Sequence, residues 1–306
     1  MRDFVLFCRN AVLVILLVFI SDYVLGSIMD NKLVFIDQPK YSRIEKSENE
    51  VVILGASRAD NQYVSSIIED SLGLKTYNYG VGAQNIYTNY AILDLILEKS
   101  KKKPSLIIWD FYYTDIIDSP GWNTENMHRL YSAYSYSDTI KSVLLLQGEK
   151  KNYLLKYIKT YKFNSKLPMA LRRLFIKESL EDGGYTPLYV KNEEKIKERQ
   201  EDRGNIDPIK IYYINKMIDL CKSQRIKLAI FISPGFYRKK NINPELNDWS
   251  NIIEDIANKK EILFYDFEQD DSFLIHPEWF YNEIHLNDEG AKEYSKIIAH
   301  ILKGEL

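Results

Sequence analysis

The sequence predicts an α/β protein with a doubly wound, three-layer fold around a five-stranded parallel sheet. Short apolar runs alternate with amphipathic helical patterns, which favours parallel strands joined by right-handed crossovers. The alternation stops after the third strand and resumes near residue 207, which predicts a largely helical insertion over residues 111–205. A long apolar stretch at the start of the chain predicts an N-terminal transmembrane helix.

The strands are recognised by short apolar runs that end at a turn. Val51–Leu54 is a continuous apolar run that ends at Gly55, as expected for a strand buried on both faces. The other four strands are expected within residues 75–80, 105–111, 227–234 and 261–267.

Amphipathic helices are expected between these strands. In residues 85–100, Tyr90, Leu93 and Leu97 share one stripe. Asp207 is a good N-cap, and Pro208 then occupies the first helical position. The complete set of expected helices is 59–72, 85–100, 207–224, 243–260 and 287–302. The order of elements predicts a flavodoxin-like sheet, whose binding sites lie at the carboxyl ends of the strands.

Residues 1–29 predict a signal anchor that remains in the cell membrane as a single span. Arg2 and Arg9 precede an apolar run and hold the N-terminus inside, so the rest of the chain is expected outside the cytoplasm. Asp22 is costly in a bilayer unless it lies near the interface. The alternatives are a cleaved signal peptide, which would make the protein secreted, and a buried helix of a soluble protein.

Residues 30–50 are polar and predict a stalk, and residues 51–306 predict the α/β domain. The insertion is expected over the carboxyl edge of the sheet, where it would set specificity. It contains helical patterns at 139–147 and 166–177. The charge run at 192–204 predicts a solvated helical face or a loop.

The composition excludes several classes of function. The net charge of −2, with lysines and acids interleaved, does not predict a nucleic-acid partner. Cys8 and Cys221 are too differently placed to predict a disulfide, and no metal-ligand spacing or cofactor motif is present. The 23 tyrosines are expected to be mostly structural, although tyrosine-lined surfaces also suit carbohydrate ligands.

Polar residues follow the first two strands at the same expected edge. Ser57 lies where a helix begins after the first strand, so it is either a nucleophile or only a helix N-cap. Gly80 and Gly82 form a tight turn after the second strand, with backbone N–H groups that could face a ligand. Asn85 could add a side-chain donor there. The pattern lacks the third glycine of a dinucleotide fingerprint, so nucleotide binding is a weak alternative.

His285 follows the fifth strand and precedes the last helix. It therefore converges on the edge that carries Ser57 and Gly80. A serine, a histidine and a backbone donor are the minimum for acyl transfer. On its own, His285 is as readily a surface residue before a helix. The three together favour a catalytic site.

The segments 53–60, 78–85 and 282–290 resemble the motifs of the SGNH (GDSL-like) hydrolases, in particular their divergent membrane-anchored bacterial members. Some of these resemble cell-envelope polysaccharide O-acetyltransferases. The resemblance covers residues 50–110 and 207–302. It implies Ser57 as nucleophile, His285 as general base, and the N–H groups of Ser57 and Gly80 as oxyanion donors.

The sequence departs from the family pattern at three places. Ala56 replaces the usual aspartate before the serine, and no asparagine follows the third strand, so Asn85 is the nearest substitute donor. Asn282 replaces the aspartate that orients the histidine. Three outcomes are open: Glu283 supplies the carboxylate, a backbone carbonyl orients His285, or the site is catalytically weak and only binds.

The resemblance implies a membrane-anchored, extracytoplasmic esterase or O-acetyltransferase that acts on an acylated envelope glycan. The alternative is a protein that is not an enzyme, namely a glycan-binding module that keeps the fold without catalysis.

Overall fold

The protein is described by a computed structural model that covers residues 1–35, 38–118, 125–164, 168, 182–190, 197–199, 205–239 and 249–305. These residues belong to two compact units. The first unit comprises residues 1–42 and 127–178, and the second comprises residues 43–126 and 179–306.

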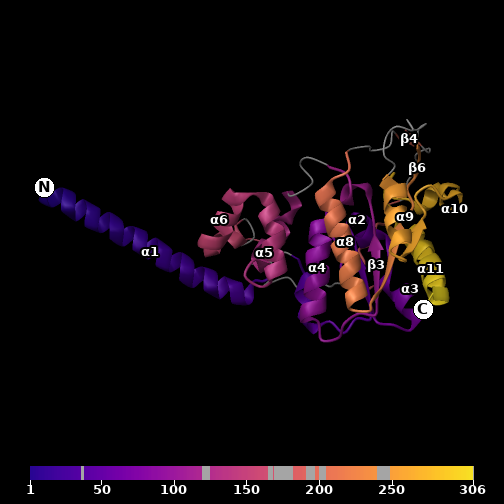
Figure 1. The fold of residues 1–306 in the computed structure, drawn as a ribbon, viewed down its shortest axis with the longest axis horizontal. Coiled ribbons are helices and arrows are strands. Elements are labelled where there is room, and N and C mark those ends of the chain that lie inside the picture. The colour runs from indigo at the N-terminus through magenta and orange to yellow at the C-terminus, as the bar shows by residue number, and fades with distance from the viewer. Residues whose placement is uncertain are drawn as a thin grey trace. The chain divides into compact units, whose positions relative to one another are not determined.

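The second unit contains the α/β sheet, and its strand order confirms the predicted fold class. All five strands are parallel, in the order β2-β1-β3-β5-β7. The central strand of this order, β3, is labelled in Figure 1. In chain order this is the 2-1-3-4-5 arrangement of flavodoxin-like folds. The strands are β1 Val51–Leu54, β2 Thr76–Asn78, β3 Leu106–Asp110, β5 Lys227–Ile232 and β7 Leu263–Asp266.

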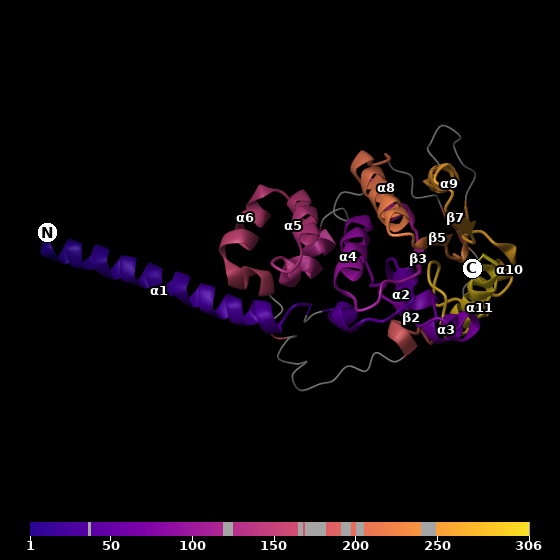
Figure 2. The same cartoon turned by 60° about the horizontal axis from the view of Figure 1, so that its bottom comes forward.

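Helices cover both faces of this sheet (Figure 2). Helices α4 and α8 pack together on one face, and α2, α3 and α11 pack together on the other. Helix α9 packs against the edge strand β7. The helices are α2 Ser57–Gln62, α3 Ser65–Leu72, α4 Ile86–Lys99, α8 Pro208–Ser223, α9 Trp249–Lys259 and α11 Asp288–Glu305.

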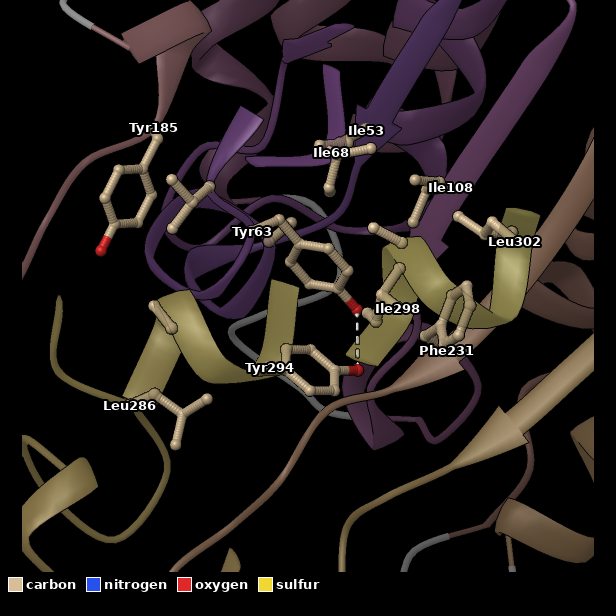
Figure 3. Close-up of a cluster of buried hydrophobic side chains, with 14 of the residues drawn as sticks. Ile53, Tyr63, Ile68, Ile108, Tyr185, Phe231, Leu286, Tyr294, Ile298 and Leu302 are labelled. Atoms are coloured by element: carbon tan, nitrogen blue, oxygen red, sulfur yellow. Dashed lines mark hydrogen bonds between the residues drawn. The ribbon is translucent and has the colours of Figure 1, made fainter. Parts of the chain in front are cut away.

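The main core lies between the sheet and helices α3 and α11 (Figure 3). Ile53 and Ile108 from the strands face Ile298 and Leu302 from α11, and all four are fully buried. The predicted continuous apolar strand is explained by this layering, because every residue of β1 is buried on one face or the other. The sheet edge that follows β1 is therefore held rigidly.

The single helix predicted over residues 59–72 is wrong, because the structure has two helices separated by Tyr63 and Val64. Both residues are extended, with φ/ψ of −117°/103° and −81°/103°. The Val64 N–H donates to Ser295 Oγ at 2.8 Å, and the Tyr63 hydroxyl contacts that of Tyr294 at 3.3 Å (Figure 3). Long-range contacts to α11 satisfy the backbone where the helix is interrupted.

Two other expectations also differ from the structure. Part of the charge run, Lys197–Arg199, forms strand β4, which pairs in parallel with β6 (Tyr237–Lys239). The run was predicted to be a helical face or a loop. This prediction missed the strand, because its pairing depends on a partner far away in the sequence. In the predicted stalk, Tyr41–Lys46 forms a short 3₁₀ helix, and Tyr41 and Ile44 are each 1% exposed.

The described parts of the insertion are mostly short helices. Its predicted helix at 166–177 lies outside the described residues, apart from residue 168. The predicted helix at 139–147 is found as α5 and a following 3₁₀ turn. The elements are η2 Tyr113–Asp115, η3 Glu125–Ala133, α5 Asp138–Leu144, η4 Leu145–Gln147, α6 Glu149–Tyr157, η5 Lys159–Phe163 and η6 Asp182–Gly184.

The first unit is built on the N-terminal helix α1, Arg2–Lys32. This helix is long and apolar enough to cross a membrane, and none of its apolar 18-residue window is buried. Its C-terminal part packs against η5. The Asp22 carboxylate accepts the backbone N–H groups of Lys159 at 2.8 Å and Thr160 at 3.0 Å. A Cβ on Gly26 would lie 2.2 Å from Lys159 Cβ, so the two backbones approach closely.

Candidate active site

The turn between β1 and α2 places Ser57 at the first position of a helix. Gly55 has φ +144°, and a Cβ there would lie 2.8 Å from the Asp110 carbonyl oxygen, so the turn requires glycine. The N-cap of α2 is Ala56, which forms no side-chain cap. The alternative that Ser57 caps the helix is therefore wrong, and its hydroxyl points elsewhere.

The Ser57 hydroxyl contacts His285. Ser57 Oγ and His285 Nε2 are 2.8 Å apart, within the hydrogen-bonding reach expected of a nucleophile and its base. His285 lies in a tight loop before α11, which is closed by an antiparallel bridge between Phe280 and Leu286. The Tyr281 N–H also donates to the His285 carbonyl at 2.9 Å. The loop thus holds the imidazole ring at the end of β1.

Asn282 orients the imidazole through a single oxygen. Asn282 Oδ1 accepts the backbone N–H groups of Ile284 at 3.0 Å and His285 at 2.9 Å, and it contacts His285 Nδ1 at 3.1 Å. Two backbone donors fix the amide with its oxygen toward the ring, because an NH₂ group there would face N–H groups. Nδ1 must then carry the proton, so Nε2 is left to accept the proton of Ser57.

This geometry differs from two of the three outcomes considered for the missing aspartate, and the third, a site that is catalytically weak and only binds, stays a prediction. Nδ1 has one proton to donate, and Asn282 accepts it, so neither Glu283 nor a backbone carbonyl takes that place. The Glu283 carbonyl accepts the Phe236 N–H at 2.8 Å, which ties the loop to the segment after β5. What the amide lacks relative to a carboxylate is the negative charge, not the orientation.

The pKa of His285 is lowered from 6.5 to about 4. Burial is the largest cause, the positive charge of Arg58 adds to it, and Asp60 opposes it. The imidazole is therefore neutral at neutral pH. A neutral imidazole with Nε2 free of a proton is the form that a general base requires.

Arg58, directly after Ser57, is the centre of a buried charged cluster that the sequence reasoning missed. The residue is 2% exposed. Its Nε donates to Ser233 Oγ at 3.0 Å, and its guanidinium carbon lies 4.7 Å from the Tyr112 ring centroid. Asp110 and Glu268 lie 4.0 and 3.9 Å from its nitrogens. The cluster fixes the side chain that follows Ser57.

Asp110 links this cluster to the core. Its Oδ2 accepts the Tyr63 hydroxyl at 2.7 Å and also the Ser233 hydroxyl. Burial raises the pKa of Asp110, and Arg58 partly offsets this increase. A sequence signal was present, because an aspartate closes the otherwise apolar strand β3 and an arginine follows Ser57. Neither signal shows by itself that the two residues meet.

In the second turn, the backbone N–H of Gly80 and the side chain of Asn85 each make a hydrogen bond within the chain. The Gly80 N–H donates to Asn78 Oδ1 at 2.8 Å, so it is engaged within the turn and the expected role of Gly80 is not supported. Asn85 Oδ1 accepts the Thr88 N–H and hydroxyl, each at 3.1 Å, as the N-cap of α4. The donor role of Asn85 stays a prediction.

A different part of this turn approaches Ser57. A Cβ built on Gly82 would lie 3.8 Å from Ser57 Cβ. The next residue, Ala83, has φ +59°, a strained conformation for a residue other than glycine. Within the described residues, the Ala83 N–H donates to no backbone or side-chain acceptor. The site is half-buried and open to solvent at Ser57, Ala83 and His285.

Comparisons with known proteins give only distant structural matches. No family model matches the chain, and no curated protein matches it. Similar solved structures include an acylhydrolase from Bacteroides fragilis (12% identity, 88% of this chain and 94% of that chain, TM-score 0.42) and a GDSL-like lipase from Bacteroides thetaiotaomicron (13%, 89% and 100%, 0.42). Another is a lipolytic protein of the GDSL family from Desulfitobacterium hafniense (10%, 83% and 99%, 0.41).

The strand order and the contact between Ser57 and His285 define the class of fold. The parallel sheet in the order β2-β1-β3-β5-β7 carries a serine directly after β1 and a histidine directly before the last helix, in contact with each other. These features give the protein an SGNH-like (GDSL-like) hydrolase fold. Among the described residues, no group of His, Cys, Asp and Glu side chains could hold a metal ion.

Proposed function

We propose that this protein catalyses acyl transfer from an ester through Ser57, as an esterase or an O-acyltransferase. The observation that carries the proposal is the chain of contacts from Ser57 Oγ to His285 Nε2, and from His285 Nδ1 to Asn282 Oδ1. A nucleophile, a base and a group that orients the base are the components of this chemistry.

In the proposed reaction, Ser57 Oγ attacks the ester carbonyl carbon while His285 Nε2 takes the hydroxyl proton. The tetrahedral intermediate then collapses, the carbon–oxygen bond to the alcohol breaks, and the imidazolium returns the proton to the leaving oxygen. The acyl group is left on Ser57. Water or a second hydroxyl, deprotonated by His285, attacks this acyl-enzyme and releases the acid or the new ester.

We assign the oxyanion donors to the N–H groups of Ser57 and Ala83. Ser57 is the first residue of α2, so its N–H has no partner within the helix. Ala83 supplies an N–H that is not used elsewhere in the described chain, in the turn whose Gly82 lies beside Ser57. Two backbone donors at fixed positions are the usual means of stabilising a developing negative charge.

The proposed substrate is an O-acyl group, such as an acetyl group, on a cell-envelope glycan. Support comes from helix α1, which is apolar enough to anchor the chain in a membrane, and from the resemblance of the motifs to envelope-acting members of the family. Aromatic side chains from the insertion, Tyr112, Tyr113 and Tyr189, belong to the same unit as Ser57. Tyr189 is 75% exposed, as a side chain that stacks on a sugar must be.

A non-catalytic glycan-binding module is the second candidate, and the neutral amide of Asn282 favours it. To test between the two, the full chain in detergent is treated with a fluorophosphonate probe and with p-nitrophenyl acetate. Labelling and turnover are expected for the wild type and for Ser142→Ala, an exposed serine on α5. Both should be lost in Ser57→Ala. A folded wild type that neither labels nor turns over would overturn the catalytic proposal.

A further inference from the structure

Helix α6 presents an exposed face of tyrosine and lysine close to the end of the apolar helix α1. Lys150, Tyr153 and Tyr157 are three and four residues apart, so they share one side of α6. Tyr153 is 66% exposed and Tyr157 is 52% exposed, and their ring centroids are 4.4 Å apart. Leu155 is buried on the opposite side, so this exposed pair is not needed for packing of the unit.

The contacts between η5 and α1 show near which residue of α1 this face lies. Tyr157 and Ile158 directly precede Lys159, whose N–H donates to the Asp22 carboxylate. Two residues span at most about 7 Å, so Tyr157 lies within that reach of Lys159 and its contact with Asp22. Ile158 is itself 38% exposed.

Asp22 is the first charged residue of α1 after Arg9, and it follows an uninterrupted apolar run that ends at Ile20. From Phe4 to Asp22 the helix rises about 27 Å at 1.5 Å per residue, which is close to the thickness of a bilayer hydrocarbon core, about 30 Å. Arg9 lies about 8 Å inside the first end of this span, from where its long side chain reaches the cytoplasmic interface. Tyr23 follows, 63% exposed, with Lys159 Nζ 4.1 Å from its ring centroid. A tyrosine and a lysine at this position are typical of the interface between hydrocarbon and water.

Basic residues surround the tyrosine pair. Lys150, Lys151 and Lys156 are exposed, and Lys156 Nζ lies 5.1 Å from the Tyr157 ring centroid. Glu149 is the one acidic residue of α6. In both views, α6 lies on the side of its unit that faces the N-terminal half of α1 (Figures 1 and 2).

We propose that this face of α6, formed by Lys150, Tyr153, Tyr157 and Ile158, rests on the membrane surface and contacts anionic phospholipid headgroups. The inference rests on the proposed membrane anchoring by α1 and is independent of the proposed catalysis. The tyrosine rings enter the headgroup region while the lysines remain with the phosphates. The first unit then rests on the bilayer surface through this face.

The test places a fluorophore on the face and a quencher in the lipid headgroups. The full chain carries Cys8→Ser, which removes the exposed thiol, while Cys221 is buried, with a pKa raised to about 12, and does not label. Tyr153→Cys and Tyr157→Cys are labelled singly, and discs without nitroxide lipid are the control. Each protein is placed in nanodiscs of phosphatidylglycerol with nitroxide-headgroup lipid.

The expected result is a loss of emission at positions 153 and 157 in discs with nitroxide-headgroup lipid that is absent in discs without nitroxide. A fourth label at Val14→Cys, with nitroxide on the acyl chains, reports the anchor itself. Quenching at Val14 but none at 153 overturns the proposal for α6 while the anchor stands. No quenching at Val14 shows that the anchoring assumption failed, and this also overturns the proposal.

The lysines are tested by reversing their charge. Lys150→Glu, Lys151→Glu and Lys156→Glu together are expected to reduce quenching at position 153 in phosphatidylglycerol discs, because each lysine near an anionic surface contributes roughly a fivefold preference for it. Unchanged quenching would overturn the role of the anionic headgroups. The label at position 153 could instead lose emission equally in neutral and anionic discs, and only in discs that hold two copies of the chain. In that case the face contacts a second copy, and the proposal fails.

Discussion

At the scale of single residues, Asn282 has the clearest consequence. Its oxygen accepts two backbone N–H groups and faces His285 Nδ1, so the amide cannot turn its NH₂ group toward the ring without losing both backbone bonds. In a serine protease, replacing the triad aspartate with asparagine lowers turnover by roughly 10⁴-fold because the histidine adopts the wrong tautomer. Here the loop prevents that error, and only the charge is missing.

Two substitutions separate orientation from charge. Asn282→Asp is expected to raise kcat/KM for p-nitrophenyl acetate about tenfold, because a carboxylate stabilises the imidazolium that forms in the transition state. Asn282→Ala is expected to lower it about a hundredfold or more, because His285 loses its orienting acceptor. Wild-type activity in Asn282→Ala would contradict the assigned role of Asn282.

The lowered pKa of His285 predicts an unusual pH profile. Protonation inactivates a general base, and the pKa is lowered to about 4 rather than 6.5. The activity is therefore expected to stay constant from neutral pH down to about pH 5 and to fall below pH 4, with the fold monitored by circular dichroism. Asn282→Asp should move this acid limb to higher pH, since a nearby negative charge raises the pKa of His285. An acid limb near pH 6.5 in the wild type would contradict this account.

At the scale of elements, the site depends on how closely two turns approach helix α2. A Cβ on Gly80 would lie 2.7 Å from both Ala59 Cβ and the Asp60 backbone nitrogen. The backbone φ of Gly80 is not positive, so the glycine is required by the close approach and not by the conformation. The second strand can therefore position the Gly82–Ala83 turn beside Ser57 only because position 80 has no side chain.

Gly80→Ala is expected to lower the free energy of unfolding by about 1–3 kcal/mol, because α2 must move to admit the methyl group. The activity should fall as well, since Ser57 begins that helix. The matched control is Gly304→Ala near the end of α11, where a Cβ would meet nothing within 4 Å and stability should stay the same or rise slightly. Urea unfolding of the two variants checks this, and equal stabilities would contradict it.

Local sequence patterns predicted most of these elements. They failed where contacts between residues far apart in the chain determine the secondary structure. The strand at Val51–Leu54 and the helix capped by Asp207 are both observed, because each is specified by neighbouring residues. The interruption at Tyr63 and Val64 was not predicted, since Ser295 lies on a helix distant in sequence. Strand β4 was missed for the same reason, because its partner follows it by about forty residues.

At the scale of the whole molecule, the chain comprises two units that require different descriptions. The first has no sheet among its described residues and is organised by α1, whose Asp22, Gly26 and Asp30 pack against residues 159–162. Lys162 is 1% exposed and pairs with Asp30. The last third of α1 is thus a structural part of this unit, beyond any role as an anchor.

Truncation at two points should distinguish these parts of α1. Deletion of residues 1–21 removes the apolar stretch and is expected to release the protein from membranes with the first unit intact. Deletion of residues 1–32 also removes Asp30 and leaves the buried Lys162 without its carboxylate, which costs about 3–5 kcal/mol. Limited proteolysis should then cut residues 127–163 faster in the longer deletion. Equal rates would contradict the packing role of α1.

The sequence by itself determined the order of the five sheet strands along the chain, the apolar N-terminal helix and the two side chains that meet, Ser57 and His285. These follow from local periodicity and from the rule that parallel strands end at one edge. Only the tertiary structure decided which groups surround that pair: the orienting oxygen of Asn282, the buried Arg58 and the engaged N–H of Gly80. Hydrogen-bond directions and burial depend on residues far apart in the chain, so no local pattern specifies them.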